Sequence, residues 1–101
     1  MTVRNKVVAI TGGAGGIGTA QTKLLAENGA EVWVLDLAAD RAEALAEEMT
    51  DMGWRVHSAG MDVASEEDWK AVVERIVAES GRLDAVVTTR ESTFGSPSRR
   101  W

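Results

Sequence analysis

Four short apolar runs alternate with three longer stretches in which apolar residues recur every three or four positions. Continuous apolar runs of this length are typical of strands buried on both faces of a parallel sheet, and they occupy residues 6–11, 31–36, 55–59 and 83–88. The stretches between them have the period of amphipathic helices, and each is followed by a glycine of the kind that ends a helix: Gly29, Gly53 and Gly81. The pattern therefore predicts the order β-α-β-α-β-α-β, with parallel strands joined by right-handed helical crossovers.

Each predicted helix has an apolar face that we expect to pack on the sheet. These faces consist of Ile17, Ala20, Leu24 and Leu25 in the first helix, Ala42, Leu45, Met49 and Met52 in the second, and Trp69, Val72, Val73, Ile76 and Val77 in the third. Asp40 is expected to cap the second helix, with Glu43 in capping-box spacing, and Ser65 opens the third with an acidic first turn. Trp33 and Trp69 are predicted to lie in the core, and His57 is predicted to face solvent.

The composition excludes several classes of protein. The 101 residues suit one domain, and a net charge of −5 argues against a nucleic-acid-binding surface. The absence of cysteine excludes a disulfide scaffold, a zinc ribbon and a cysteine nucleophile, and the single histidine cannot form a multi-histidine metal site. No apolar run is long enough to span a bilayer, and the first residues lack the form of a signal peptide. We therefore expect a cytoplasmic protein without a metal, nucleic-acid or membrane partner.

The functional signal is a glycine-rich turn between the first predicted strand and the first predicted helix. Residues 11–18 read Thr-Gly-Gly-Ala-Gly-Gly-Ile-Gly, and the next predicted strand ends in Asp36. Glycines permit a tight turn and let backbone N–H groups approach a pyrophosphate, which a helix N-terminus also favours. A carboxylate at the end of the second strand would accept hydrogen bonds from ribose hydroxyls and repel a 2′-phosphate. This combination predicts a dinucleotide site. A glycine-rich turn without a ligand is the alternative, and a P-loop fits less well because no Gly-Lys-Ser/Thr follows.

In a second register the same turn matches the pattern T-G-x-x-x-G-I-G, and with it the chain resembles the short-chain dehydrogenase/reductase family. Further matches follow in family order: Asp36 at the end of the second strand, Asp62-Val63 after the third, and Gly81-Arg82-Leu83-Asp84 before the fourth. The resemblance covers residues 5 to about 87. It implies the N-terminal NAD(P)-binding half of such a protein, an α/β fold with a partial Rossmann (doubly wound) parallel sheet of strand order 3-2-1-4.

The resemblance also implies roles for individual residues. Asp36 would bind the adenosine ribose, and Asp62 and Val63 would flank the adenine. The pyrophosphate and the adjoining ribose would be held by Gly12, Gly16, Ile17 and Gly18. NADP-preferring relatives often carry a basic residue where this chain has Ala14, Gly15 and Leu37, so NAD is favoured over NADP, and Arg41 is interpreted as a helix surface residue. The predicted cofactor site comprises Thr11, Gly12, Gly15, Gly16, Ile17, Gly18, Asp36, Leu37, Asp62 and Val63.

The chain departs from the family after its fourth predicted strand. Where the family has Asn-Asn-Ala-Gly, this chain has Thr88-Thr89-Arg90-Glu91, and it contains no tyrosine for the family's Tyr-x-x-x-Lys pair. No catalytic residue is therefore predicted, and whether this chain is an enzyme is left open. Codons for residues 88–93 can be chosen so that a two-base displacement reads Asn-Ala-Gly-Ile-Asn, from which we infer a truncated gene with a reading-frame change after Val87. Residues 1–88 are predicted to form the dinucleotide-binding half-domain, and residues 89–101 an irregular, disordered tail.

Three functional hypotheses follow from this sequence. The first is an NAD(P)-binding segment of an oxidoreductase, not catalytic as this chain, whose intact relatives transfer hydride between the nicotinamide cofactor and an alcohol or carbonyl substrate. The second is a stand-alone, non-enzymatic dinucleotide-binding module, and the third is a nonfunctional gene remnant. An uncovered fourth strand would expose an apolar edge at Ala85-Val86-Val87, which predicts marginal stability and self-association.

Overall fold

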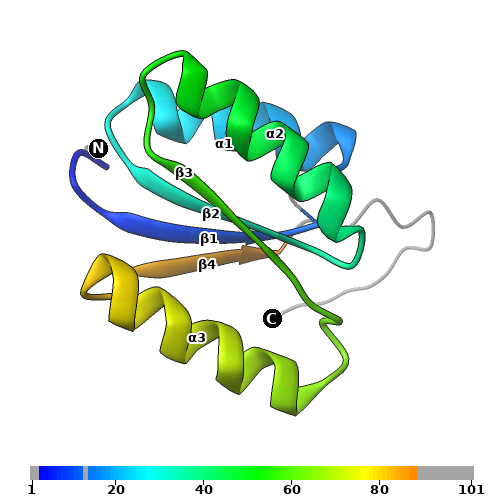
Figure 1. Cartoon of the computed structure of the whole chain (residues 1–101). Coiled ribbons are helices and arrows are strands. Elements are labelled where there is room, and N and C mark those ends of the chain that lie inside the picture. Colours follow the sequence, from blue (N-terminus) through cyan, green and yellow to red (C-terminus); the bar gives the residue numbers. More distant parts are fainter. Residues whose placement is uncertain (1–2, 13, 89–101) are drawn as a thin grey trace, which may run out of the picture.

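A computed structural model describes residues 3–12 and 14–88 of the chain. Its strands and helices alternate in the predicted order (Figure 1). The elements are β1 (Val7–Thr11), α1 (Gly16–Glu27), β2 (Glu31–Asp36), α2 (Ala39–Asp51), β3 (Val56–Gly60), α3 (Glu66–Ser80) and β4 (Ala85–Thr88). The predicted tail, residues 89–101, lies outside the described residues, as do most of the positions on which the hypothesis of a reading-frame change rests.

The four strands form one parallel sheet in the order β3-β2-β1-β4, which confirms the predicted order 3-2-1-4. In the centre of the sheet, Ala9 of β1 lies beside Trp33 of β2 and Val86 of β4. Since all strands are parallel, their carboxyl ends meet at one edge of the sheet, where ligands of doubly wound folds bind.

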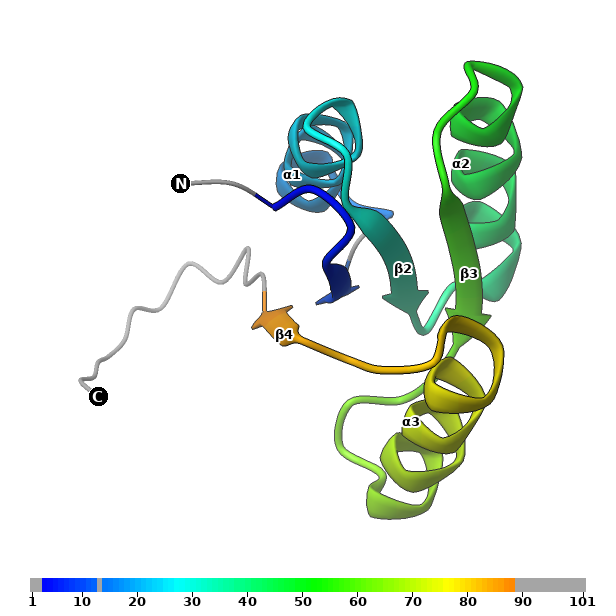
Figure 2. The same ribbon diagram turned by 90° about the vertical axis from the view of Figure 1, so that its left-hand side faces the viewer.

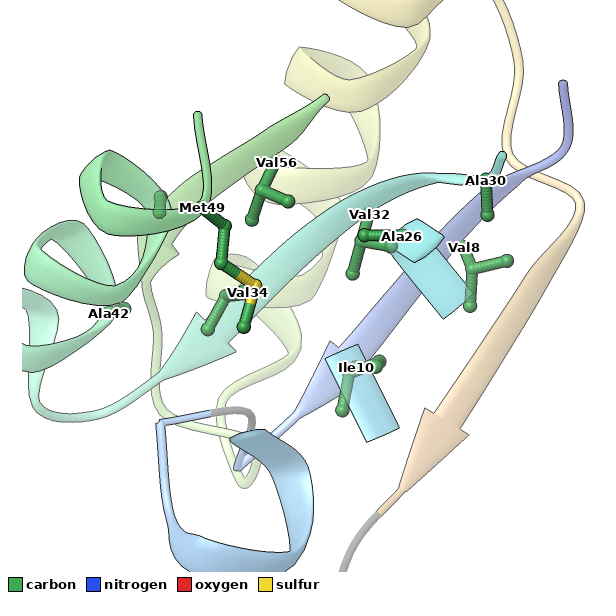
Figure 3. Close-up of a cluster of buried hydrophobic side chains, with 10 residues drawn as sticks. Val8, Ile10, Ala26, Ala30, Val32, Val34, Ala42, Met49 and Val56 are labelled. Atoms are coloured by element: carbon green, nitrogen blue, oxygen red, sulfur yellow. The ribbon is translucent and has the colours of Figure 1, made fainter. Parts of the chain in front are cut away.

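Helices cover both faces of the sheet. Helices α1 and α2 lie on one face and α3 lies on the other (Figures 1 and 2). Successive side chains of a strand point to opposite faces, so the strands contribute to two cores. Figure 3 shows the core under α1 and α2, which contains Val8, Ile10, Val32, Val34 and Val56. The core under α3 contains Val7, Ala9, Trp33, Leu35 and Ile76.

Helix α1 packs mostly through other residues than the predicted ones. The prediction was Ile17, Ala20, Leu24 and Leu25; Leu25 is partly buried against the core, but the exposed fractions of Ile17 and Leu24 are 48% and 60%. The buried residues of α1 are Gly18, Thr22 and Ala26. Small residues on the contact face let a helix approach a sheet closely, so the bulk of a side chain does not by itself identify the buried face.

The start of α2 corrects the predicted cap. The residue before the helix is Ala38, and Asp40 lies inside the first turn without capping it. The Oδ1 atom of Asp36 instead accepts a hydrogen bond of 2.9 Å from the Ala38 N–H group. Ala42 and Met49 are buried as predicted, but Met52 follows the helix and is 55% exposed. Asp36 therefore belongs both to the end of β2 and to the entry of α2.

The ends of α3 agree with the sequence prediction. The Ser65 Oγ atom accepts a hydrogen bond of 3.1 Å from the Asp68 N–H group, which is the arrangement of a helix N-cap. Gly81 ends the helix with a φ of 88°, a conformation that glycine adopts at little cost. Val72 and Ile76 are buried, whereas Val77, predicted on the same face, is 46% exposed.

A polar cluster surrounds the buried indole of Trp33. His57 lies against that ring at a centroid distance of 4.6 Å, and its Nε2 atom is 2.7 Å from Glu31 Oε2. Ser80 accepts a hydrogen bond from Trp33 Nε1 and donates one of 2.6 Å to Glu31. The His57 side chain keeps 36% of its surface exposed, in line with its predicted solvent-facing position, but the parallel register also places it beside Trp33. Arg75 of α3 covers the same ring.

The carboxyl group of Glu31 is ionised more readily than an ordinary glutamate. Burial by itself raises the pKa of Glu31, but hydrogen bonds from Ser80 and His57 outweigh it, together with the positive charges of His57 and Arg55. The net pKa lies below the usual value. This carboxylate links β2 and β3 to the last residue of α3.

A second carboxylate fastens β4 to β1. The Val7 N–H group donates a hydrogen bond of 2.8 Å to Asp84 Oδ2, and the Asp84 N–H group donates one of 2.8 Å to Val7 O. Arg82 lies 2.9 Å from the same oxygen. The Val7 hydrogen bond and the Arg82 side chain lower the pKa of Asp84. On its outer side β4 has no neighbouring strand among the described residues, and Val86 is 44% exposed.

Replacing Asp84 with asparagine should flatten the acid side of the stability profile. A depressed folded-state pKa adds stability above the ordinary value of 3.8, and that stability is lost as the pH falls through the folded value. We expect D84N to melt below the wild-type protein near neutral pH and the two melting temperatures to converge in acid. Circular dichroism melting from neutral pH down to below 3.8 measures the difference between the two melting temperatures. Asp51→Asn, on the exposed end of α2, is the control, and parallel curves for D84N and wild type would contradict the role of Asp84.

Candidate functional site

The three predicted parts of the site leave the sheet at the same edge. The glycine turn follows β1, Asp36 ends β2, and the loop of Asp62 and Val63 follows β3. Thr11 lies beside Leu35, and Asp36 lies beside Gly60, in the register of the sheet. Their neighbourhood therefore follows from the parallel topology.

The glycine turn is stabilised by backbone hydrogen bonds. Gly12 has a φ of 69°, and its N–H group donates a hydrogen bond of 2.7 Å to Leu35 O at the end of β2. The Gly15 N–H group then donates one of 3.2 Å to Gly12 O. A positive φ is ordinary for glycine and strained for residues with a side chain. Gly12 is therefore required by the path of the chain as it leaves β1.

The first turn of α1 has the form of an anion site. The residue preceding the helix is Gly15, which has no side chain to cap the helix amides. A Cβ atom added to Gly16 would meet nothing within 4 Å, so the surface above the turn is open. Gly18 is buried within the helix. Backbone N–H groups and the helix dipole make such an N-terminus attractive to a phosphate.

Asp36 is hydrogen-bonded directly to the glycine turn. Its Oδ2 atom accepts a hydrogen bond of 3.1 Å from the Ala14 N–H group, and its Oδ1 atom accepts one from Ala38 at the entry of α2. A carboxylate offers about four acceptor positions, so these two bonds leave capacity for ribose hydroxyls. Leu37, the next residue, is 76% exposed. The sequence correctly placed Asp36 beside the turn.

Gly60 is a site-shaping residue that the sequence analysis missed. A Cβ atom at Gly60 would lie 2.7 Å from the Cβ atom of Ala39, at the start of α2. No real Cβ pair tolerates that separation, so only glycine lets α2 begin this close to the end of β3. A glycine two residues before Asp62, directly after a predicted strand, was the available signal.

The loop after β3 is held by the first turns of α3. The Met61 N–H group donates a hydrogen bond of 3.1 Å to Asp36 O, which keeps the start of this loop beside the end of β2. The Ala64 N–H group donates one of 2.9 Å to Asp62 Oδ1, and Trp69 Nε1 donates one of 3.0 Å to Val63 O. Val63 is 55% exposed, so its side chain is accessible to a ligand.

Trp69 and Arg41 have contacts that the sequence did not predict. Trp69, predicted to lie in the core, is half-buried and packs against the core under α3, and its indole N–H group donates to the carbonyl oxygen of Val63. Arg41 is exposed, as a surface residue should be, yet its Nη2 atom reaches Ala14 O in the glycine turn at 3.4 Å. Both contacts join residues that only the folded chain brings together.

Metal-binding clusters and membrane-spanning helices are absent from the described residues. Within residues 3–12 and 14–88, no three His, Cys, Asp or Glu side chains are grouped as a metal ion would require. Across this part of the chain no helix combines the length and the apolarity needed to cross a membrane. A cavity of about 370 Å³ lies between α2, β3 and Arg75 of α3, and none of the predicted cofactor residues lines it.

Comparison with known proteins identifies the family. The family model described as short chain dehydrogenase matches residues 6–89. The cyclopentanol dehydrogenase of Comamonas testosteroni is 40% identical over 85 residues, which are 84% of this chain and 34% of that protein. The chain therefore belongs to the short-chain dehydrogenase family. It spans about a third of the length of that relative.

Solved structures give the same result. A hydroxysteroid dehydrogenase from Escherichia coli superposes with a TM-score of 0.82 and 29% identity, covering 86% of this chain and 37% of that one. A putative D-mannonate oxidoreductase from Haemophilus influenza, with bound NAD, gives a TM-score of 0.80 and 28% identity, covering 84% and 30%. The fold is therefore part of the doubly wound α/β fold of these oxidoreductases, as the sequence resemblance implied.

Proposed function

We propose that this chain is the NAD-binding segment of a short-chain dehydrogenase-type oxidoreductase. The observation that carries the proposal is the hydrogen bond between Asp36 Oδ2 and the Ala14 N–H group. It holds a carboxylate, the natural acceptor for ribose hydroxyls, beside the glycine turn and the N-terminus of α1, the natural site for a pyrophosphate. Family membership and the NAD-bound relative support the same ligand class.

The residues fit a dinucleotide along the whole edge of the sheet. The backbone of the turn would hold the pyrophosphate, with Thr11 at its start, where the Thr11 Oγ1 atom lies 3.4 Å from Val87 O of β4. Asp36 and the neighbouring Leu37 would hold the adenosine ribose, and Asp62 with Val63 would flank the adenine. The pyrophosphate-binding residues are then Gly12, Gly15, Gly16, Ile17 and Gly18.

Asp36 also favours NAD over NADP. Its negative charge would lie next to the ribose 2′ position and would repel a 2′-phosphate. The nicotinamide of the cofactor supplies hydride transfer in this family. The 101 residues contain no tyrosine to serve as the family's acid or base. We therefore assign this chain the binding and orientation of the cofactor and no proton transfer of its own.

Calorimetric titration of the full chain with NAD and with NADP tests the proposal. We expect saturable binding with NAD preferred. Asp36→Ala should weaken NAD about 10- to 100-fold, because a hydrogen bond to a charged group contributes roughly 1.5–3 kcal/mol, and the preference for NAD over NADP should disappear. Asp40→Ala removes a nearby exposed carboxylate and should leave both affinities unchanged.

Two outcomes would overturn the proposal. A wild-type chain that binds neither dinucleotide would contradict the proposal, and poor folding in addition would favour the hypothesis of a gene remnant. Unchanged preference in D36A would remove Asp36 from the site. Because Asp36 also accepts the Ala38 amide, circular dichroism melting of D36A must accompany the titration to separate lost binding from lost folding.

A further inference from the structure

The backbone of Ala14 is held at both its N–H group and its carbonyl oxygen. Its N–H group donates to Asp36 Oδ2 at 3.1 Å, and its carbonyl oxygen accepts from Arg41 Nη2 at 3.4 Å. Both contacts span more than twenty residues of sequence. Asp36 ends β2 and Arg41 lies in the first turn of α2. Both contacts to the centre of the glycine turn therefore come from the segment between Asp36 and Arg41.

We propose that Arg41 is a positioning residue for the dinucleotide site, which acts by fixing the Ala14 carbonyl while Asp36 fixes the Ala14 amide. The proposal rests on the proposed function of the site. It replaces the sequence interpretation of Arg41 as an ordinary surface residue of α2.

The segment from Asp36 to Arg41 is fixed by contacts of its own. Asp36 Oδ1 accepts from the Ala38 N–H group, and Gly60 allows Ala39 to lie directly against the end of β3. The glycine turn, in contrast, has almost no side chains with which to stabilise its own conformation. Glycine loses more backbone freedom on ordering than any other residue, so contacts from outside the turn matter more here than elsewhere.

Arg41 has no competing partner built into its own helix. An arginine on a helix usually pairs with a carboxylate three or four residues away. At those spacings Arg41 has Leu37, Ala38, Ala44 and Leu45. The acidic residues of α2 lie at other spacings. The guanidinium is therefore available to the turn.

A turn ordered in advance binds its ligand with less loss of entropy. A pyrophosphate that meets a fixed set of amides does not have to order the glycines at the moment of binding. Asp36 keeps acceptor capacity for the ribose while it holds the Ala14 amide. Loss of Arg41 should therefore weaken both NAD and NADP, with little effect on global stability.

The test uses the full chain and two variants, Arg41→Ala and Lys23→Ala. Lys23 is exposed in the second half of α1 and provides the matched loss of one positive charge. Dissociation constants for NAD are measured at low and high salt, melting temperatures are compared, and amide hydrogen exchange at Ala14 is followed without ligand. Salt separates positioning from charge attraction, because attraction between exposed charges is screened.

We expect R41A to bind NAD about three- to tenfold more weakly, the range for one modest hydrogen bond. This factor should persist at high salt, and the Ala14 amide of R41A should exchange faster than in the wild type. The melting temperature of R41A should match that of the wild type, and K23A should bind NAD as the wild type does. Equal binding by R41A and wild type, a deficit that vanishes with salt, or a deficit that follows a fall in melting temperature would each overturn the proposal. If the wild-type chain binds no dinucleotide, both the proposed function and the binding role of Arg41 are wrong. Comparing amide exchange at Ala14 in R41A and wild type then still shows whether Arg41 orders the turn.

Discussion

Replacing Gly12 with valine should abolish dinucleotide binding. Gly12 adopts a φ of 69° and donates a hydrogen bond of 2.7 Å to Leu35 O. A β-branched residue at positive φ is a genuine outlier and costs of order 1–3 kcal/mol, and its side chain would also stand where the pyrophosphate approaches the backbone. We expect NAD affinity to fall by at least about 100-fold, which corresponds to roughly 2.7 kcal/mol of binding free energy.

The matched control for this variant is Gly53→Val. Gly53 has a φ of 95° at the end of α2, and an added Cβ atom there would meet nothing within 4 Å. Valine at position 53 therefore imposes the same kind of backbone strain as valine at position 12, but away from the site. G53V should lose stability and keep NAD binding under conditions where it is folded. If G12V bound NAD like the wild type, or if the two variants lost binding equally, the assigned role of the turn would be wrong.

Replacing Trp33 with alanine should leave the chain largely unfolded. Trp33 is fully buried in the core under α3, its Nε1–H group donates to Ser80 Oγ, and its ring contacts His57 and Arg75. Truncating a buried tryptophan costs about 3–5 kcal/mol, a large part of the roughly 5–15 kcal/mol that stabilises ordinary domains. The melting temperature should fall by more than about 10 °C, or no cooperative transition should remain.

Circular dichroism melting and urea denaturation measure this effect. Trp69→Ala is the comparison, because Trp69 is half-buried at the margin of the same core and its indole N–H group donates to Val63 O in the loop after β3. It should cost clearly less stability than W33A. A cooperative W33A transition within a few degrees of wild type would show that the core under α3 contributes little to the fold.

The sequence by itself determined the architecture and the position of Asp36 beside the glycine turn. Apolar runs separated by helical periods define parallel βαβ units, and the glycines at the helix ends mark where each helix stops, as Gly53 and Gly81 do with positive φ. The spacing of the turn and Asp36 places them together because parallel strands end at one edge. These features depend on local patterns and on the topology that they impose.

Only the tertiary structure decided which surfaces meet. The size of Ile17 and Leu24 suggested the packing face of α1, but the helix buries its small residues because they allow the closest approach to the sheet. Asp40 had the right residue type and spacing for a helix cap. Asp36, at the end of β2, instead accepts a hydrogen bond from the N–H group of Ala38, the residue that precedes α2.

The same limit applies to the residues around the site. Gly60 is needed only because Ala39 lies against it, and Arg41 and Trp69 hold the backbone of loops that fold next to them. His57 contacts Trp33 and Glu31 because the register of β2 and β3 aligns them. Most of these contacts join residues distant in sequence, and their geometry is set by the packing of whole elements, which no local pattern of residues records.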